Sequence, residues 1–291
     1  MDFDNGKGLL MLCEEHNLKI SEVMLKRELS NFNLNKEQAI QKMHTAYDIM
    51  RASISEALNT PKKSMGGLIG GEAAKMQKRM SGGISVCGGI TSKAVMYAMA
   101  VMEVNACMGL IVAAPTAGSS GVVPGTFLAV QEQFGFSDND MIHALFTASA
   151  IGYIITKNAS VSGAAAGCQA EVGSASAMAA AAIAELLGAS PAACISAAGM
   201  ALSNLLGLVC DPIRGLVEEP CQKRNAIGAS NALICAEIAL SDINFVLPFD
   251  EMVEVMYKVG TGLPHELRET SLGGMAVAPS VMAEIAKVII K

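Results

Sequence analysis

The chain has 291 residues, of which 52% are hydrophobic, 4% are aromatic and 16% are charged, and its formal net charge is −6. No basic stripe accompanies this acidic balance, which argues against nucleic acid as the main partner. The apolar volume comes from Ala, Leu, Ile, Val and nineteen Met, without any Trp. Because small apolar residues let helices pack closely and alanine is the best helix former, this composition favours a helical core.

Helix signals recur along the chain. Residues 35–58 carry apolar side chains at three- and four-residue steps, which predicts an amphipathic helix. Asn35, with Gln38 three residues later, predicts its N-terminal cap. Ser190 followed by Pro191 predicts the start of another helix. Further helices are predicted over 91–109, 138–156, 173–187, 191–206, 225–240, 249–259 and 280–289.

These signals together predict an all-α fold: a compact helical domain with several Gly/Ser-rich loops around a buried site. Only the INFVL segment (243–247) alternates like a strand. We expect an N-terminal helical segment, 1–60, to form one continuous unit with a helical domain over 61–291.

The most apolar stretches, 94–114 and 177–209, raise the question of a membrane. Charged residues interrupt both, Glu103 in the first and Glu185 in the second. A spanning helix needs about 20 residues with few or no charges, so we interpret both stretches as buried core helices. The acidic N-terminus has no export-signal pattern, which predicts a cytoplasmic protein with reduced thiols.

Glycine-rich loops separate the predicted helices, at 64–72, 81–89, 114–125 and 158–173. Glycine in a folded loop carries an entropic cost. Repeated glycine loops between buried helices therefore indicate that backbone amides are needed, for example to hold an anion at helix N-termini.

The eight cysteines divide by context. Four lie in apolar helical patterns and are interpreted as small buried hydrophobes: Cys13, Cys107, Cys194 and Cys235. Cys87 lies in a glycine loop and is ambiguous.

Cys168, Cys210 and Cys221 differ, because all three lie in Gly/Pro-interrupted segments with amides or cations nearby. Such surroundings lower a thiol's pKa and favour thiolate ligands. No Cys-x-x-Cys pair is present, so zinc stays open beside an iron–sulfur cluster. A [4Fe–4S] cluster with three thiolates would keep one iron open as a Lewis acid for hydration or dehydration chemistry.

Four motifs, in this order, resemble the alpha chain of bacterial iron–sulfur-dependent L-serine dehydratases. The motifs are SMGGLIGGEAAKM (64–76), APTAGSSGVVPGT (114–126), NASVSGAAAGCQAEVGSASAMAAA (158–181) and CDPIRGLVEEPCQKRNAIGA (210–229). The last is the most specific of them.

The resemblance implies a [4Fe–4S] cluster held by Cys168, Cys210 and Cys221 in a helical catalytic domain. It also implies conversion of L-serine to pyruvate and ammonia without pyridoxal phosphate. Backbone amides and hydroxyls near the cluster are expected to hold the substrate carboxylate. The candidate substrate-binding residues are Ser64, Gly66, Gly67, Thr116, Gly118, Ser119, Ser120, Gly121, Asn158, Arg224 and Asn225.

Simpler roles stand beside three of these assignments. Arg224 offers a positive charge that would offset a negative cluster, Asn225 would cap the following helix, and Asn158 would serve only to end a helix. The general base is not readable from the sequence, although His265, after Pro264 in a loop, is the least ordinary of the four histidines.

Single-chain members of the family carry an extra N-terminal domain, for which the first sixty residues are too short. The resemblance therefore implies a separate beta subunit and a hetero-oligomer. Arg214 and Glu219 depart from the family pattern beside the expected ligands, which leaves L-cysteine and L-threonine as alternative substrates.

Two other classes of function remain as alternatives. A pyridoxal-phosphate lyase would use Lys63 or Lys157 for its Schiff base and would have an α/β fold. A non-catalytic, metal-stapled scaffold or redox sensor would instead bind a partner through Met-rich surface.

Overall fold

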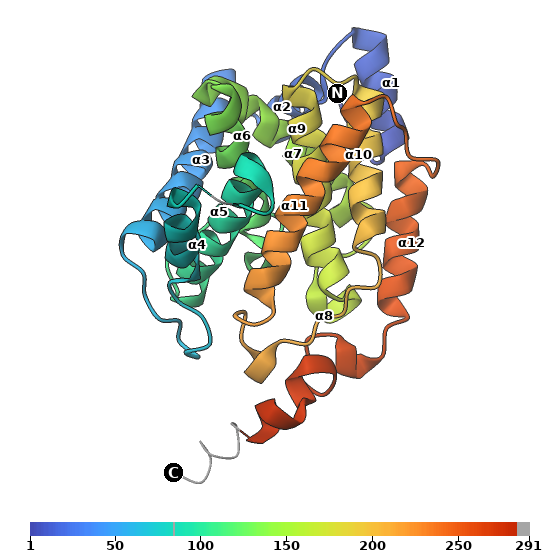
Figure 1. Ribbon diagram of the computed structural model, residues 1–291. Coiled ribbons are helices and arrows are strands. Elements are labelled where there is room, and N and C mark those ends of the chain that lie inside the picture. Colours follow the sequence, from blue (N-terminus) through green and yellow to red (C-terminus); the bar gives the residue numbers. More distant parts are fainter. Residues whose placement is uncertain (84, 284–291) are drawn as a thin grey trace.

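The computed structural model describes residues 1–83 and 85–283 and confirms the predicted all-α fold (Figure 1). Within these residues the extended pairing is one isolated parallel bridge, between Cys210 and Arg268. The α-helices are α1 (Gly6–His16), α2 (Ile20–Phe32), α3 (Lys36–Asn59), α4 (Glu72–Ser81), α5 (Gly88–Ala106), α6 (Val122–Phe134), α7 (Asp138–Asn158), α8 (Gly163–Ala166), α9 (Ser174–Leu186), α10 (Pro191–Asn204), α11 (Cys221–Leu240) and α12 (Phe249–Thr261). Short turns are the 3₁₀ helices η1 (Ala117–Ser119), η3 (Ile213–Gly215), η4 (His265–Leu267) and η5 (Gly274–Val277) and the π-helix η2 (Gln169–Gly173).

The capping signals place helix starts correctly. Asn35 Oδ1 accepts a hydrogen bond from the Gln38 amide at 2.8 Å, and the Gln38 side chain accepts one from the Asn35 amide at 3.0 Å. Ser190 caps α10 through the Ala193 amide, with Pro191 as the first helical residue. Both pairs satisfy amides that a helix start would otherwise leave unpaired.

Other parts of the prediction need correction. The segment 243–247 is not a strand: it is an irregular connection in which the Phe245 amide donates to Ser196 Oγ at 2.7 Å, and the described residues offer it no partner strand. Helix α6 was not predicted, because it begins within the glycine- and proline-containing stretch 114–125. Pro124 is tolerated in its first turn, since first-turn amides have no partner within the helix. The predicted helix over 280–289 lies mostly outside the described residues.

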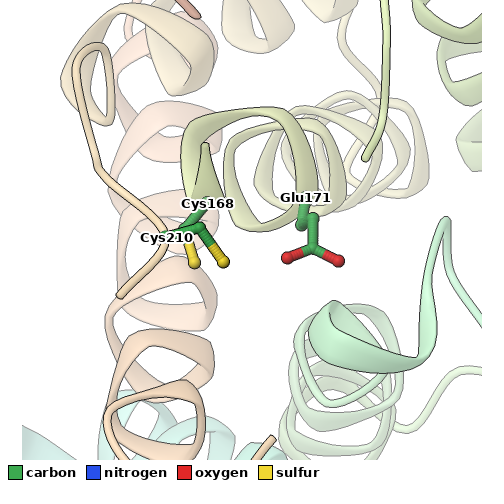
Figure 2. Close-up of side chains that lie close together, drawn as sticks. All are labelled: Cys168, Glu171 and Cys210. Carbon is green, nitrogen blue, oxygen red and sulfur yellow. The ribbon is translucent and has the colours of Figure 1, made fainter. Parts of the chain in front are cut away.

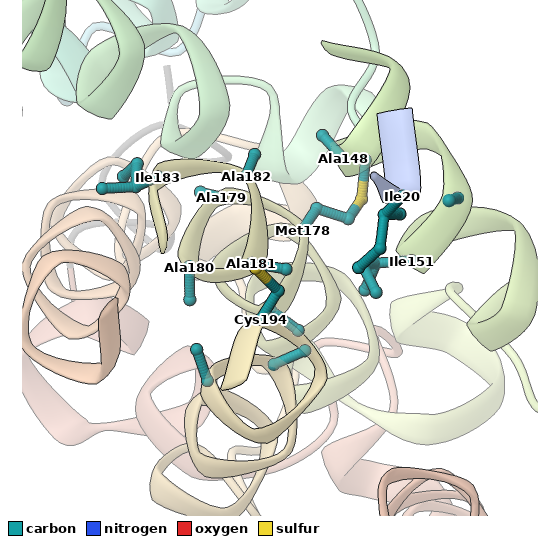
Figure 3. Packing of buried hydrophobic residues seen from close by; sticks show 14 of the residues in the cluster. Ile20, Ala148, Ile151, Met178, Ala179, Ala180, Ala181, Ala182, Ile183 and Cys194 are labelled. Atoms are coloured by element: carbon teal, nitrogen blue, oxygen red, sulfur yellow. The ribbon is translucent and has the colours of Figure 1, made fainter. Parts of the chain in front are cut away.

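Helix α9 is the centre of the molecule. Twelve of its thirteen residues are buried, and it packs against α6, α7, α10 and α11. Its alanine run (179–182) leaves room for these neighbours to approach closely. Figure 3 shows Ile20 of α2 pointing toward Ile151 of α7 and Met178 of α9, and all three belong to one apolar cluster. The N-terminal helices therefore share the core of the rest of the chain.

Carboxylates from distant segments hold several helix starts in place. Glu185, at the end of α9, accepts from the Ile20 amide at 2.8 Å and from the Thr147 hydroxyl at 2.6 Å. Glu103 accepts from the amides of Gly71 and Ala73, at 2.9 and 2.8 Å, at the start of α4. Both acids are buried, and burial raises the pKa of Glu103. A buried charge is tolerated when it is hydrogen-bonded in this way.

These contacts explain why acids interrupt the two most apolar stretches of the sequence. The charges cap neighbouring helices inside the protein. None of the helices in the described part of the chain is both long and apolar enough to cross a membrane.

The Glu185 cap gives a first prediction. Glu185→Ala should lower the free energy of unfolding by roughly 2 to 3 kcal/mol, because buried amide and hydroxyl donors lose a charged acceptor. Urea denaturation followed by circular dichroism measures the change. Glu254→Ala is the control: Glu254 forms an exposed pair with Lys258 at 2.6 Å, and its loss should cost less than about 0.5 kcal/mol. Equal losses in the two variants would contradict the capping role.

Candidate metal centre and active site

Cys168 is placed by a tight contact between two loops. It follows Gly167, which has a φ of +78°, and an added Cβ at Gly167 would lie 2.7 Å from the Leu208 carbonyl oxygen. The Gln169 amide donates to that same oxygen at 2.9 Å. Only glycine fits such a close approach with a positive φ. The loop that carries Cys168 is thereby fixed against the loop that leads to Cys210.

The π-helix η2 then connects Cys168 to α9, and Glu171 lies within it. Single π-turns in helices recur at functional sites. Gln169 fixes this turn on both sides: its side-chain amide donates to the Met256 carbonyl at 2.8 Å, and its oxygen accepts from the Gly207 amide at 2.7 Å.

Cys210 is held by backbone pairing with the segment after α12. Its amide donates to the Leu267 carbonyl at 2.8 Å, and its own carbonyl accepts from the Glu269 amide at 2.7 Å. These two bonds form the parallel bridge with Arg268. The segment 265–269 is therefore part of the framework of the site.

The thiols of Cys168 and Cys210 lie together and face the carboxylate of Glu171 (Figure 2). One ligand atom from each residue lies within 4.8 Å of the other two, an arrangement that could hold a metal ion. Both thiols are buried. The hydrogen bond to Cys168, followed by burial, raises the pKa of the Cys210 thiol.

Glu171 is the residue that sequence reasoning missed. Burial raises its pKa to about 7, although the Thr116 hydroxyl, which donates to Oε1 at 2.8 Å, opposes the shift. Glycines make room for the carboxylate: an added Cβ at Gly118 would lie 2.9 Å from Oε1, and one at Gly163 would lie 2.7 Å from Oε2. A signal existed, because Glu171 is the only charged residue between 158 and 184.

Cys221 lies outside this compact group, as the first residue of α11. Its thiol is buried, and burial raises its pKa; negative charge at Cys168 and Glu171 acts in the same direction, while Arg224 opposes it. The three cysteines predicted as ligands therefore include two in direct proximity and a third, also buried, whose pKa is raised by burial and by negative charge at Cys168.

Arg224 supplies the positive charge at the site. Its guanidinium donates to Cys168 Sγ at 3.5 Å and to the Val209 carbonyl at 2.8 Å. It also forms an ion pair with Asp211 at 2.8 Å, in which both side chains are largely buried. A guanidinium beside a thiol stabilises the thiolate, and Asp211 fixes the orientation of the guanidinium.

Within the loop 114–121, Thr116 and Gly118 contact Glu171, while the remaining polar groups hold the loop together. Asn225 accepts from the Gly121 amide at 3.0 Å and donates to the Gly118 carbonyl at 2.8 Å. Ser119 and Ser120 are fully buried, and Ser120 donates to the Ala117 carbonyl at 2.8 Å. Asn225 thus ties this loop to α11 directly after Arg224.

Two predicted substrate-binding groups make other contacts in this structure. Ser64 Oγ and the Gly66 amide donate to the carboxylate of Glu218, at 2.7 and 2.6 Å, so the loop that contains Gly67 already holds an anion. The Asn158 side chain donates to the carbonyls of Asp4 and Ile154, at 2.7 and 2.8 Å. Its amide is directed to the N-terminal segment and its own helix.

The remaining singled-out residues lie on the surface around the site. His265 is exposed at the start of η4. Arg214 reaches the Gly66 carbonyl at 3.5 Å, and Glu219 pairs with Lys223. Arg214 and Glu219, which depart from the family pattern, thus make their contacts outside the group formed by Cys168, Cys210 and Glu171.

The donor set fits a thiophilic metal group. The buried thiols of Cys168 and Cys210 lie together, Cys221 is buried at the start of α11, and the Arg224 guanidinium donates to Cys168. Gly163 also leaves space, since an added Cβ there would lie 3.0 Å from Cys210 Sγ. Thiolate ligands suit iron–sulfur clusters and zinc.

Comparison with known proteins identifies the family to which this chain is similar. A family model described as the serine dehydratase alpha chain matches residues 15–276. The chain is 48% identical to the probable L-serine dehydratase alpha chain of Bacillus subtilis, covering 96% of this chain and 92% of that protein. It is 41% identical to the L-serine dehydratase alpha chain of Peptoniphilus asaccharolyticus, covering 94% of each.

This chain therefore belongs to the serine dehydratase alpha chain family. A longer relative, L-serine dehydratase 2 of Escherichia coli, is 39% identical over 94% of this chain, but the match covers 61% of the E. coli protein.

The close packing at Gly163 gives a second prediction. Gly163→Ala should push Glu171 and Cys210 apart at a cost of about 1 to 3 kcal/mol and expose the paired thiols. Reaction of the metal-free protein with a thiol reagent, with the labelled cysteines identified by mass spectrometry, should show faster labelling of Cys168 and Cys210.

Gly89→Ala is the matched control, because an added Cβ at Gly89 meets nothing within 4 Å. Exposed Cys87 should label at the same rate in every variant. Unchanged labelling of Cys168 and Cys210 in Gly163→Ala would contradict the packing described for this site.

Proposed function

We propose that this chain is the alpha subunit of an L-serine dehydratase that converts L-serine to pyruvate and ammonia. The observation that carries the proposal is the pair of buried thiols, Cys168 and Cys210, beside Glu171 and Arg224. It occurs in a chain that is 41–48% identical to alpha chains named for this activity. The all-α fold also disfavours the pyridoxal-phosphate alternative, which required an α/β fold.

The proposed cofactor is a [4Fe–4S] cluster held by Cys168, Cys210 and Cys221. When bound, a cluster with three thiolate ligands supplies a Lewis-acidic iron with an open position for the substrate hydroxyl. The clustering of two thiols, the burial of the third and the guanidinium beside them support this ligand set.

The chain's own residues would bind and orient the substrate. The amides of Ala117 and Gly118 are proposed to form the carboxylate side of the substrate site, with Asn225 fixing their position through Gly118 and Gly121. Glu171 Oε2, on which no group in the described residues donates a hydrogen bond, faces the thiols and is proposed to hold the substrate ammonium. Hydrogen-bond donors on one side and a carboxyl group on the other match the two ends of an amino acid.

A separate beta subunit is the proposed partner. The alpha-chain names of the B. subtilis and P. asaccharolyticus relatives support it, and so does the additional length of the E. coli relative. We propose that the two chains form a hetero-oligomer in the cytoplasm.

The third prediction tests cofactor and activity together. Anaerobic reconstitution with iron and sulfide should give about four irons per chain and, with the beta chain present, pyruvate from L-serine. Cys168→Ser, Cys210→Ser and Cys221→Ser should each lose most of the iron and the activity. Iron, sulfide and pyruvate assays measure the outcome, with L-threonine and L-cysteine as competing substrates.

Cys235→Ser is the control, because Cys235 is buried among Asn204 and Asn231 on α10 and α11 and takes no part in the proposed site. It should keep the iron and the activity. Binding of one zinc ion in place of iron, or full iron content in Cys221→Ser, would overturn the proposed cluster.

A further inference from the structure

Glu218 is a buried acid that the proposed chemistry does not use. It is 2% exposed, and its carboxylate accepts three hydrogen bonds from one loop: from Ser64 Oγ at 2.7 Å, from the Gly66 amide at 2.6 Å and from the Leu68 amide at 2.9 Å. Ser64 Oγ is itself oriented by the Ile69 amide, which donates to it at 3.2 Å. The loop 64–69 thus forms a shaped receptor for a carboxylate, and Glu218 fills it.

The receptor is built for close contact. An added Cβ at Gly66 would lie 2.8 Å from Glu218 Oε1 and 2.3 Å from Leu216 Cδ1, so no side chain fits there. Gly67 has a φ of +74°, which lets the loop turn its amides toward one point. The amides of Gly66 and Leu68 donate to this carboxylate, while the Gly67 amide between them donates to the Ser64 carbonyl at 3.0 Å and closes the turn.

Glu218 lies on the loop that joins two of the proposed ligands. This ligand loop, residues 211–220, runs between Cys210 and Cys221. Near Cys210 it is held by Asp211, which accepts from the Met275 amide at 2.7 Å and pairs with Arg224. Near Cys221 its side-chain anchor is Glu218, and the Glu218 carbonyl also accepts from the Gln222 amide, at 2.9 Å, in the first turn of α11.

We propose that Glu218 is a positioning residue that fixes Cys221 relative to Cys168 and Cys210 by seating its carboxylate in the 64–69 receptor. The receptor, predicted from the sequence as a cradle for the substrate carboxylate, serves the ligand loop. This inference rests on the proposed function for the ligand role of Cys221. The position of Cys221 itself is measurable without metal.

The decisive variant is Glu218→Ala, tested in the full-length, metal-free chain. Removal of the carboxylate should free the start of α11, so Cys221 should react about tenfold faster with a thiol reagent, the effect of a local opening that is easier by one factor of ten. Thermal unfolding should begin roughly 5 °C lower. Glu218→Gln keeps the shape and one acceptor oxygen, and should lie between Glu218→Ala and the unaltered chain.

Chemical rescue separates a vacated receptor from general damage. Formate fits a site that binds one carboxylate, so added formate should slow Cys221 labelling and raise the unfolding temperature of Glu218→Ala. The same formate should leave the unaltered chain unchanged. Glu219→Ala, which removes the adjacent acid and its surface pair with Lys223, should show neither the defect nor the rescue.

The rival role for the loop gives a different result. If the 64–69 receptor binds the substrate carboxylate, removal of Glu218 should open it, lower the KM for L-serine and leave Cys221 labelling at the original rate. That outcome would overturn the positioning role, as would a defect that formate does not relieve.

A different result would contradict the proposed function without contradicting the role of Glu218. Full iron content in Cys221→Ser would remove Cys221 from the ligand set, yet the labelling and formate results for Glu218→Ala would still decide whether Glu218 fixes the start of α11.

Discussion

The structure depends on carboxylates that reach across the sequence to seat on backbone amides. Glu185 holds the start of α2, Glu103 the start of α4 and Asp250 the amides of Gly6 and Lys7 at the start of α1. Each bond joins segments that are at least 30 residues apart. Helix starts leave unpaired amides with partial positive charge, and a buried carboxylate needs several donors. The carboxylate accepts hydrogen bonds from the unpaired amides, and the amides supply the donors that the carboxylate needs. Each such contact fixes the start of one helix against another element.

This arrangement also accounts for the composition. Charged residues make up only 16% of the chain, yet several acids are placed inside the fold. The alanine-rich helices supply little side-chain polarity of their own, and α9 is almost wholly buried. Close packing of small side chains gives the core its density, while the acid–amide contacts set where each helix begins. The site lies where η2 packs against α11 and where the 207–210 loop brings Cys210 beside Cys168 and Glu171 (Figure 2).

The parts of the fold that could be predicted from the sequence are those set by interactions between residues close together in the chain. Local signals worked: Asn35 with Gln38 and Ser190 with Pro191 marked real helix starts, because a cap and its amides lie within four residues. Local signals failed where tertiary contact decides. Helix α6 begins in a glycine- and proline-rich stretch and is stabilised by packing against α5 and α9, and INFVL has the alternation of a strand without a partner.

The site also contains residues that the sequence indicated and one that it did not. The sequence pattern singled out Cys168 and Cys210, which lie 42 positions apart and meet in the structure. It did not single out Glu171, whose proximity to both thiols depends on the π-turn and on Gly118 and Gly163. The glycine loop 64–72 was predicted to hold the carboxylate of the substrate, and in the structure it contacts a carboxylate. The chain itself supplies one, over a separation of about 150 residues that no local pattern records.

The ligand loop shows what these contacts achieve together. Its first residue, Asp211, follows Cys210 and is tied to the Met275 amide and to Arg224; Glu218, near its other end, is tied to the 64–69 receptor. Asp211 and Glu218 bind different segments of the chain, so carboxylates fix the loop near both of its ends. Arg224 joins one anchor to Cys168 directly. If Cys168, Cys210 and Cys221 bind a metal group as proposed, these protein contacts would orient the ligand loop beforehand, and the binding energy of that group would not be spent on ordering the loop.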